Sequence, residues 1–210
     1  MSKKSRAAVA QPRLHFAADE TRLPWLAPLL QSYYTTDQGV AQGIRQARRQ
    51  GRSKLACASG CAACCRTHSE IPVYPLELAG IAWFAVKRLD GAVREKVRLQ
   101  LAQHKSIPSC PFLVDETCSI HPLRPIACRL FNVFDRACAE GEDAFHTRRG
   151  DVLAPVTFYK NKALALMLHD GVPTEAERKA RVADGSVHRL AQNLRKVPWE
   201  NLALRMQAQG

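Results

Sequence analysis

The sequence has 210 residues, is 46% hydrophobic and carries a formal charge of +12, from 31 Lys and Arg against 19 Asp and Glu. This length and apolar content allow one folded domain with appendages and argue against a disordered chain. No apolar run approaches the ~18 residues that suggest a membrane span, and the basic start MSKKSRAAVAQPRLHF lacks the apolar segment of a secretory signal. We therefore expect a soluble, cytoplasmic protein.

The N-terminal part of the chain predicts a loose tail followed by helices. Residues 1–18 are basic and show no apolar periodicity. Apolar residues then recur at helical spacing over residues 26–30 and again over residues 40–47. Thr36 and Asp37 are residue types that cap helices, so we expect two separate helices with a break between them.

Proline and glycine punctuate the middle of the chain. Ile71 to Pro75 is expected to be extended, because a proline disfavours the helical conformation in the residue before it. Pro75 then suits the first turn of a helix that runs to Leu89, with Gly91 as its stop. A second amphipathic helix is predicted over residues 92–104.

The rest of the chain is expected to be irregular first and then helical. Residues 106–125 are rich in proline, so we expect no regular element there. A short helix is predicted from Pro125 and a longer one over residues 156–169. Further helices are expected to begin near Thr174, a capping residue, and near Pro198.

The chemistry of the chain lies in its eight cysteines, which all fall within residues 57–138. They are Cys57, Cys61, Cys64, Cys65, Cys110, Cys118, Cys128 and Cys138. The cytosol keeps thiols reduced, and a chain of this length does not need disulfides to fold. Clustered cysteines in such a chain are typical of metal sites, and thiolates select zinc or iron–sulfur over magnesium or calcium. We interpret all eight as metal ligands.

The spacing of the first four cysteines predicts that the others return to them in space. If residues 55–66 were helical, Cys57 and Cys65 would share a face but stand about 12 Å apart along the axis. One zinc ion with bonds of ~2.3 Å cannot gather sulfurs over that span. Ligands from residues 110–138 must therefore complete the site, and ligation would supply order to residues 106–125.

Four cysteine motifs together carry a family resemblance. They are Cys57-x3-Cys61-x2-Cys64-Cys65, Cys110-Pro111-Phe112-Leu113, Cys118-Ser119-Ile120-His121 and Arg124-Pro125-x2-Cys128-Arg129. These motifs resemble the YkgJ-type cysteine-cluster (CxxCxxCC) family over about residues 55–138. That family is described as a zinc- or iron-chelating domain with eight cysteines, so the resemblance implies a metal site without an assigned reaction. In that family a tyrosine often stands at the position of His121. His121 is therefore a candidate substitute ligand for the metal, or a surface residue.

These observations predict a mainly α fold, a small helical domain organised around a cysteine-rich metal site with irregular loops. The expected parts are a flexible basic tail over residues 1–18, N-terminal helices over 19–54, the cysteine-cluster metal-binding domain over 55–140 and supporting helices over 141–210. Trp83 is expected in a helix core.

The metal is left open between zinc and iron, with an iron–sulfur cluster slightly favoured. A cluster accepts thiolates that are spaced more widely than the ligands of one zinc ion. Arg124 and Arg129 are candidates to offset thiolate charge and tune a cluster. His68 is a candidate ninth ligand, with a capping or surface role as its alternative. A redox or metal-handling partner would accompany such a site.

Two other functions remain as alternatives. The basic stretch over residues 45–54 permits a nucleic-acid-binding protein with structural zinc, although no aromatic residues interleave with its charges. A cluster-dependent enzyme is the second alternative, because a flagellin lysine methylase is similar over the cysteine domain within a larger protein. The spacing from Cys57 to Cys64 also matches radical-SAM enzymes, but Ala63 replaces their aromatic residue. No catalytic residue is assigned, and enzymatic activity stays undecided.

Overall fold

The computed structural model describes residues 12–52, 54–58 and 60–209. It is 57% helical, with ten α-helices and little sheet in the described residues, which confirms the prediction of a mainly α fold. The helices are α1 Ala17–Arg22, α2 Leu26–Arg49, α3 Ala63–Thr67, α4 Pro75–Lys87, α5 Gly91–Ala102, α6 Ile126–Leu130, α7 Ala144–Thr147, α8 Thr157–Met167, α9 Glu175–Ala183 and α10 Glu200–Ala208. The strands are β1 Pro72–Val73, β2 Leu113–Val114, β3 Thr117–Cys118 and β4 Gln192–Asn193. Short 3₁₀ turns are η2 His104–Ser106, η3 His121–Leu123, η4 Arg149–Asp151 and η5 Ser186–Leu190.

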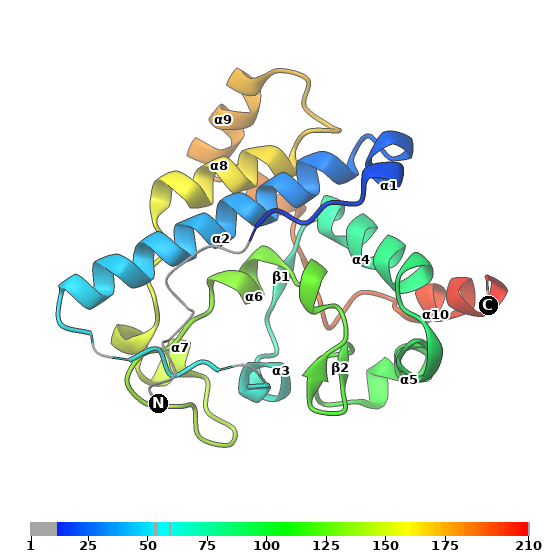
Figure 1. Cartoon of the computed structure of the whole chain (residues 1–210), viewed down its shortest axis with the longest axis horizontal. Coiled ribbons are helices and arrows are strands. Elements are labelled where there is room, and N and C mark those ends of the chain that lie inside the picture. The colour runs from blue at the N-terminus through cyan, green and yellow to red at the C-terminus, as the bar shows by residue number, and fades with distance from the viewer. Residues whose placement is uncertain (1–11, 53, 59, 210) are drawn as a thin grey trace.

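Helices α2 and α8 lie side by side across one layer of the molecule (Figure 1). The expected break in α2 is absent, because Thr36 does not cap a second helix. Its hydroxyl donates to the carbonyl of Ser32 within the same helix, at 2.9 Å. Gly39 allows α8 to approach, since a Cβ atom there would stand 2.6 Å from Cβ of Tyr159. Close packing on α8 therefore stabilises one continuous helix.

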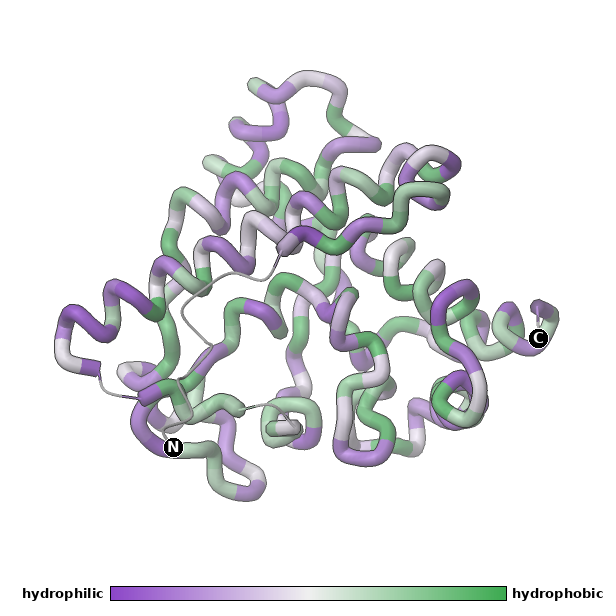
Figure 2. The backbone as a smooth tube through the Cα atoms, in the orientation of Figure 1, coloured by the Kyte–Doolittle hydropathy of each residue, from purple (hydrophilic) through white to green (hydrophobic). Residues whose placement is uncertain are grey.

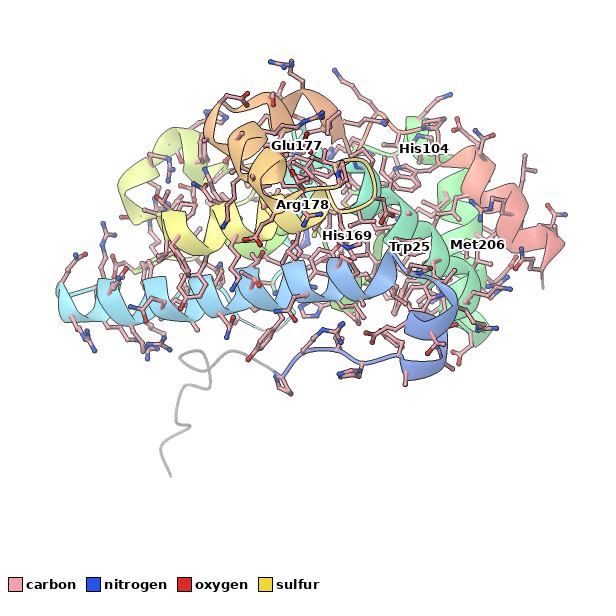
Figure 3. All side chains as sticks on the ribbon, turned by 90° about the horizontal axis from the view of Figure 1, so that it is seen from above. Trp25, His104, His169, Glu177, Arg178 and Met206 are labelled. Atoms are coloured by element: carbon pink, nitrogen blue, oxygen red, sulfur yellow. The ribbon has the colours of Figure 1, made fainter. Side chains whose placement is uncertain are left out.

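A second layer is formed by α4, α5 and α10 (Figure 1). Trp83 on α4 is 8% exposed, which confirms its place in a helix core. Gly91 begins α5 with a φ of +50°, so it starts the next helix and does not simply stop α4. Arg94 on α5 donates to the carbonyl of Met206, at 2.6 Å. Figure 3 shows Met206 where α10 meets α5.

The C-terminal part of the chain returns to the segment that follows the first cysteine cluster. Strand β1 confirms the extended conformation predicted around Pro72, and it pairs antiparallel with β4, with Pro72 opposite Asn193. The amide of Leu194 donates to the carbonyl of Ile71, at 2.8 Å. This pairing places the last third of the chain against the cysteine region.

The surface of the helical layer changes character along α2. Its last turns, up to Arg49, are hydrophilic and project past the neighbouring helices (Figure 2). Of the tail expected over residues 1–18, residues 1–11 lie outside the described part of the chain, and Ala17 already begins α1. Within the described residues, every helix is too short or too polar to cross a membrane.

Candidate metal centre

The first cysteine cluster is only partly helical. Helix α3 contains Cys64 and Cys65, whereas Cys57 and Cys61 precede it. Gly60 has a φ of +82°, in the left-handed region that favours glycine, and the amide of Cys61 donates to the carbonyl of Ala58 at 3.1 Å. The helix considered over residues 55–66 is therefore wrong, because this turn interrupts it. The long axial separation that such a helix would impose does not apply.

Cys57 is held against the segment that leads to Cys138. The amide of Ala56 donates to the carbonyl of Val133 at 2.7 Å, and the amide of Val133 donates to Sγ of Cys57 at 3.3 Å. Leu55 and Phe134 form an antiparallel bridge beside them. A backbone N–H aimed at sulfur stabilises a thiolate, so this position suits a metal ligand.

Cys138 lies beside a cationic group on the same side of the molecule. Its Sγ is 3.7 Å from Nη2 of Arg148, which is also paired with Glu142 at 2.8 Å. Burial raises the pKa of the Cys138 thiol, and Arg148 opposes that increase. Cys57 and Cys138 both pack against the same small apolar cluster, which is formed by Val133, Ala144 and Val152.

Cys65 and Cys110 meet through both backbone and side chains. The amide of Cys110 donates to the carbonyl of Cys65 at 2.7 Å, and the neighbouring Cys110 thiol is the largest cause that raises the pKa of Cys65. The hairpin of β2 and β3 follows, with Leu113 paired to Cys118. This hairpin brings Cys118 back toward α3.

Cys128 is carried by α6, whose start is fixed by a buried carboxylate. Glu77 is completely buried and accepts from the amides of Tyr74 at 2.9 Å and Ile126 at 2.6 Å. Burial raises the pKa of Glu77 to about 7. Burial also raises the pKa of Cys128 well above its ordinary value, with Cys64 as the next contributor. Sequence reasoning missed this role of Glu77, since a lone glutamate near a proline resembles any helix start.

All eight cysteines are free thiols, ranging from the exposed Cys61 to the buried Cys110. This donor set fits zinc or iron, which thiolate sulfur prefers. In the described part of the chain, no three His, Cys, Asp or Glu side chains stand as a set that could hold a metal ion.

Raised pKa values favour the protonated form of three thiols of the first cluster, those of Cys57, Cys64 and Cys65. Burial raises the pKa of Cys57 to about 11. The contact with Cys110 is the largest of the causes that raise the pKa of Cys65 to about 12. The contact with Cys65 is the largest cause that raises the pKa of Cys64 above its ordinary value. A metal ion must displace these protons, so binding is expected to release them.

The candidate side chains around the cysteines have separate roles. Arg129 is buried and donates to Asp37 at 2.7 Å and to the carbonyl of Arg124 at 2.9 Å, so its hydrogen bonds fix α2 and α6. Burial raises the pKa of Cys118, and the backbone at Ile120 and the cations Arg124 and Arg129 oppose that increase. His121 is exposed. Its Nδ1 lies 3.1 Å from Nη1 of Arg124, within hydrogen-bonding distance.

His68 lies next to the cluster and faces a carboxylate. Its Nε2 is 3.2 Å from Oδ1 of Asp143, an ion-pair distance without hydrogen-bond alignment. Its ring packs edge-on against Phe131, with centroids 4.3 Å apart. Burial lowers the pKa of His68, so the ring favours its neutral form.

Arg195 connects the C-terminal segment to both halves of the cysteine region. Its Nη2 donates to the carbonyls of Cys65 and Arg66, each at 3.1 Å, and its Nη1 donates to the carbonyl of Pro108. Sequence reasoning missed this residue, because one arginine far along the chain carries no local signal of its partners.

Comparison with known families agrees with the cysteine motifs. Residues 56–149 match the family model CxxCxxCC, described as a "Putative zinc- or iron-chelating domain". The matched segment contains all eight cysteines and extends past Arg148. Comparison with the curated proteins and with the solved structures gives no match. The resemblance of the cysteine motifs to the CxxCxxCC family is thus confirmed over residues 56–149.

Proposed function

We propose that this protein binds zinc or iron through the thiolates of all eight cysteines, and that an iron–sulfur cluster is the favoured form. The observation that carries the proposal is that two later cysteine segments contact the first cysteine cluster through the backbone. The segment of Val133 holds Cys57, and the amide of Cys110 holds the carbonyl of Cys65. Sulfurs that arrive from separate segments suit a cluster, whose several irons accept ligands over a wider span than one zinc ion.

The surroundings support a metal-handling or redox role over nucleic-acid binding. Arg52, at the end of the basic stretch 45–54, pairs with Asp135 at 3.4 Å and Asp151 at 3.3 Å. This arginine therefore fixes the loop before Cys138, and its charge is balanced within the protein. The exposed Cys61 gives a partner access to the site.

The test is anaerobic purification followed by elemental analysis for zinc and iron, assay of acid-labile sulfide and an absorption spectrum. Iron with sulfide would support the cluster, and zinc without sulfide would support a thiolate zinc site. A variant with Cys110→Ser and Cys128→Ser is the control for adventitious metal and should lose bound metal. Wild-type protein that binds neither zinc nor iron would refute the proposal.

A further inference from the structure

We propose that Arg148 positions Cys138 for metal binding, because it fixes the loop of residues 135–142 and donates a hydrogen bond to the sulfur of that cysteine. This inference rests on the proposed metal binding and adds a residue that acts through one of the ligands. Arg148 is not a ligand itself, since a guanidinium group has no lone pair to offer a metal ion.

The loop of residues 135–142 has little apolar burial of its own. It projects from an edge of the molecule near α7 (Figure 1). Among its eight residues, Cys138 and Glu142 are half-buried and the other six are exposed. Cys138 packs against the small apolar cluster that also contacts Cys57. Polar contacts must therefore supply most of the order of this loop.

The guanidinium group of Arg148 makes these polar contacts on both sides of Cys138. Its Nη2 donates to the carbonyl of Arg136 at 2.8 Å, and its Nε donates to Oε1 of Glu142 at 2.8 Å. The other oxygen of Glu142 accepts from the amide of Ala139, at 2.8 Å. The same Nη2 of Arg148 lies 3.7 Å from Sγ of Cys138. One side chain thus holds the backbone before and after the cysteine as well as the thiol.

Arg148 is itself fixed to the rest of the fold. Its side chain is 10% exposed, and its Nη1 donates to Oδ2 of Asp151 at 3.0 Å. The second oxygen of Asp151 pairs with Arg52 at 3.3 Å, and Arg52 also pairs with Asp135 at the start of the loop. A planar guanidinium group with acceptors on every side keeps one orientation, which a flexible ammonium group would not. The position of the loop is therefore set by this network of charges.

The hydrogen bond to sulfur links the network to metal binding. A donor on a ligand offsets part of the negative charge that thiolates bring to a metal, and it holds the ligand in place before binding. Cys57 receives such a bond from the backbone amide of Val133, at 3.3 Å, whereas Cys138 receives its bond from a side chain. Cys138 is therefore a ligand whose support a single substitution can remove.

The role of Arg148 can be tested on the full-length protein loaded with Zn²⁺. Competition with a chromophoric chelator should show ~10–100-fold weaker Zn²⁺ binding in Arg148→Ala, the range typical of residues that support a metal ligand. Arg148→Lys keeps the charge and loses the fork, so it should recover only part of the affinity. Labelling of the loaded protein with iodoacetamide, followed by peptide mass spectrometry, should show faster alkylation of Cys138 in Arg148→Ala and an unchanged rate at the buried Cys110.

Arg149→Ala is the matched control, because it removes the same charge from the neighbouring residue. The Arg149 guanidinium lies over the ring of Phe145, 4.4 Å from its centroid, and the residue is exposed. We expect this control to bind Zn²⁺ as wild type does. Equal weakening in both variants would overturn the assignment, and so would wild-type affinity together with wild-type labelling of Cys138 in Arg148→Ala.

A second variant decides if Arg148→Ala fails to fold. Glu142→Gln keeps the size of the side chain and replaces the carboxylate that orients Arg148, so it should weaken Zn²⁺ binding and expose Cys138 in the same direction. Wild-type affinity and labelling in this variant would overturn the assignment. Wild-type protein that binds neither zinc nor iron would instead refute metal binding itself, and this role of Arg148 with it.

Discussion

Arg195 offers a direct test of how the C-terminal segment supports the cysteine region. The change Arg195→Ala removes donors from the carbonyls of Cys65, Arg66 and Pro108. Hydrogen bonds from a charged donor contribute ~1.5–3 kcal/mol when they are shielded from water. Two of the three are exposed and water can replace them, so we expect a total loss of about 2 kcal/mol in the free energy of unfolding.

The expected loss corresponds to a decrease of about 4–8 °C in Tm for a chain of this size. The assay is thermal and urea unfolding of wild type and variant at equal metal loading, with hydrogen exchange of individual amides. The amide of Cys110 donates to the carbonyl of Cys65, which Arg195 also binds, so its protection should fall more than that of α2. Arg195→Lys should recover only part of the stability, because an ammonium group cannot reach three carbonyls as a fork.

Unchanged Tm together with unchanged protection of the Cys110 amide would refute the reasoning. A uniform decrease in protection across the whole chain would also contradict it, because it would show that Arg195 supports global stability and not the cysteine region in particular. The change of Arg189, a surface arginine in the same part of the chain, to alanine is the matched control. We expect that control to lie within ~0.5 kcal/mol of wild type.

Three further predictions concern the buried carboxylate, the helix packing and the metal. The pKa of Glu77 is raised from 4.5 to about 7, so its contribution to stability is complete below pH 4.5 and is lost as pH rises through 7. At ~1.4 kcal/mol per pKa unit, this contribution of Glu77 to the free energy of unfolding is about 3 kcal/mol. The Glu77→Gln variant should lose the pH dependence of stability between pH 4.5 and 7, measured by urea unfolding. A pH profile identical to that of wild type would contradict this prediction. Gly39→Ala should cost ~1–3 kcal/mol in thermal unfolding, because its Cβ would meet Tyr159, whereas Gly150→Ala, with open space around it, should be nearly neutral. Removal of metal by a chelator should expose residues 106–140 to proteolysis first, and equal cleavage of loaded and treated protein there would count against metal-dependent order.

Local rules predicted the elements whose causes are local. Pro75 opens α4 as expected from its fixed φ, and a short helix follows Pro125 because proline is tolerated only at a helix start. The helix predicted over residues 156–169 corresponds to α8. Thr174 caps α9 by accepting from the amide of Glu177, at 3.2 Å. In each case the residue that decides the conformation lies inside the element or next to it.

Long-range contacts decided the features that the sequence did not predict. The capping residue Thr36 lies within one helix because α8 packs along α2, and propensity for a cap does not outweigh that burial. The pairing of β1 with β4 joins residues that lie far apart in the chain, and two residues in each strand leave no periodic pattern. The same holds for Arg195, whose partners include Pro108.

Three contacts from outside the thiols position the segments that carry the cysteines. Val133 fixes Cys57, Cys65 fixes Cys110, and Glu77 fixes the helix that carries Cys128. The first two contacts join cysteine segments to one another, and the third joins α6 to α4 of the helical scaffold. A scaffold of this kind lowers the conformational entropy that a metal ion must overcome to gather its ligands. Metal affinity in this protein should therefore depend on the scaffold as much as on the thiols, and scaffold variants such as Arg195→Ala should weaken zinc binding while every cysteine remains in place.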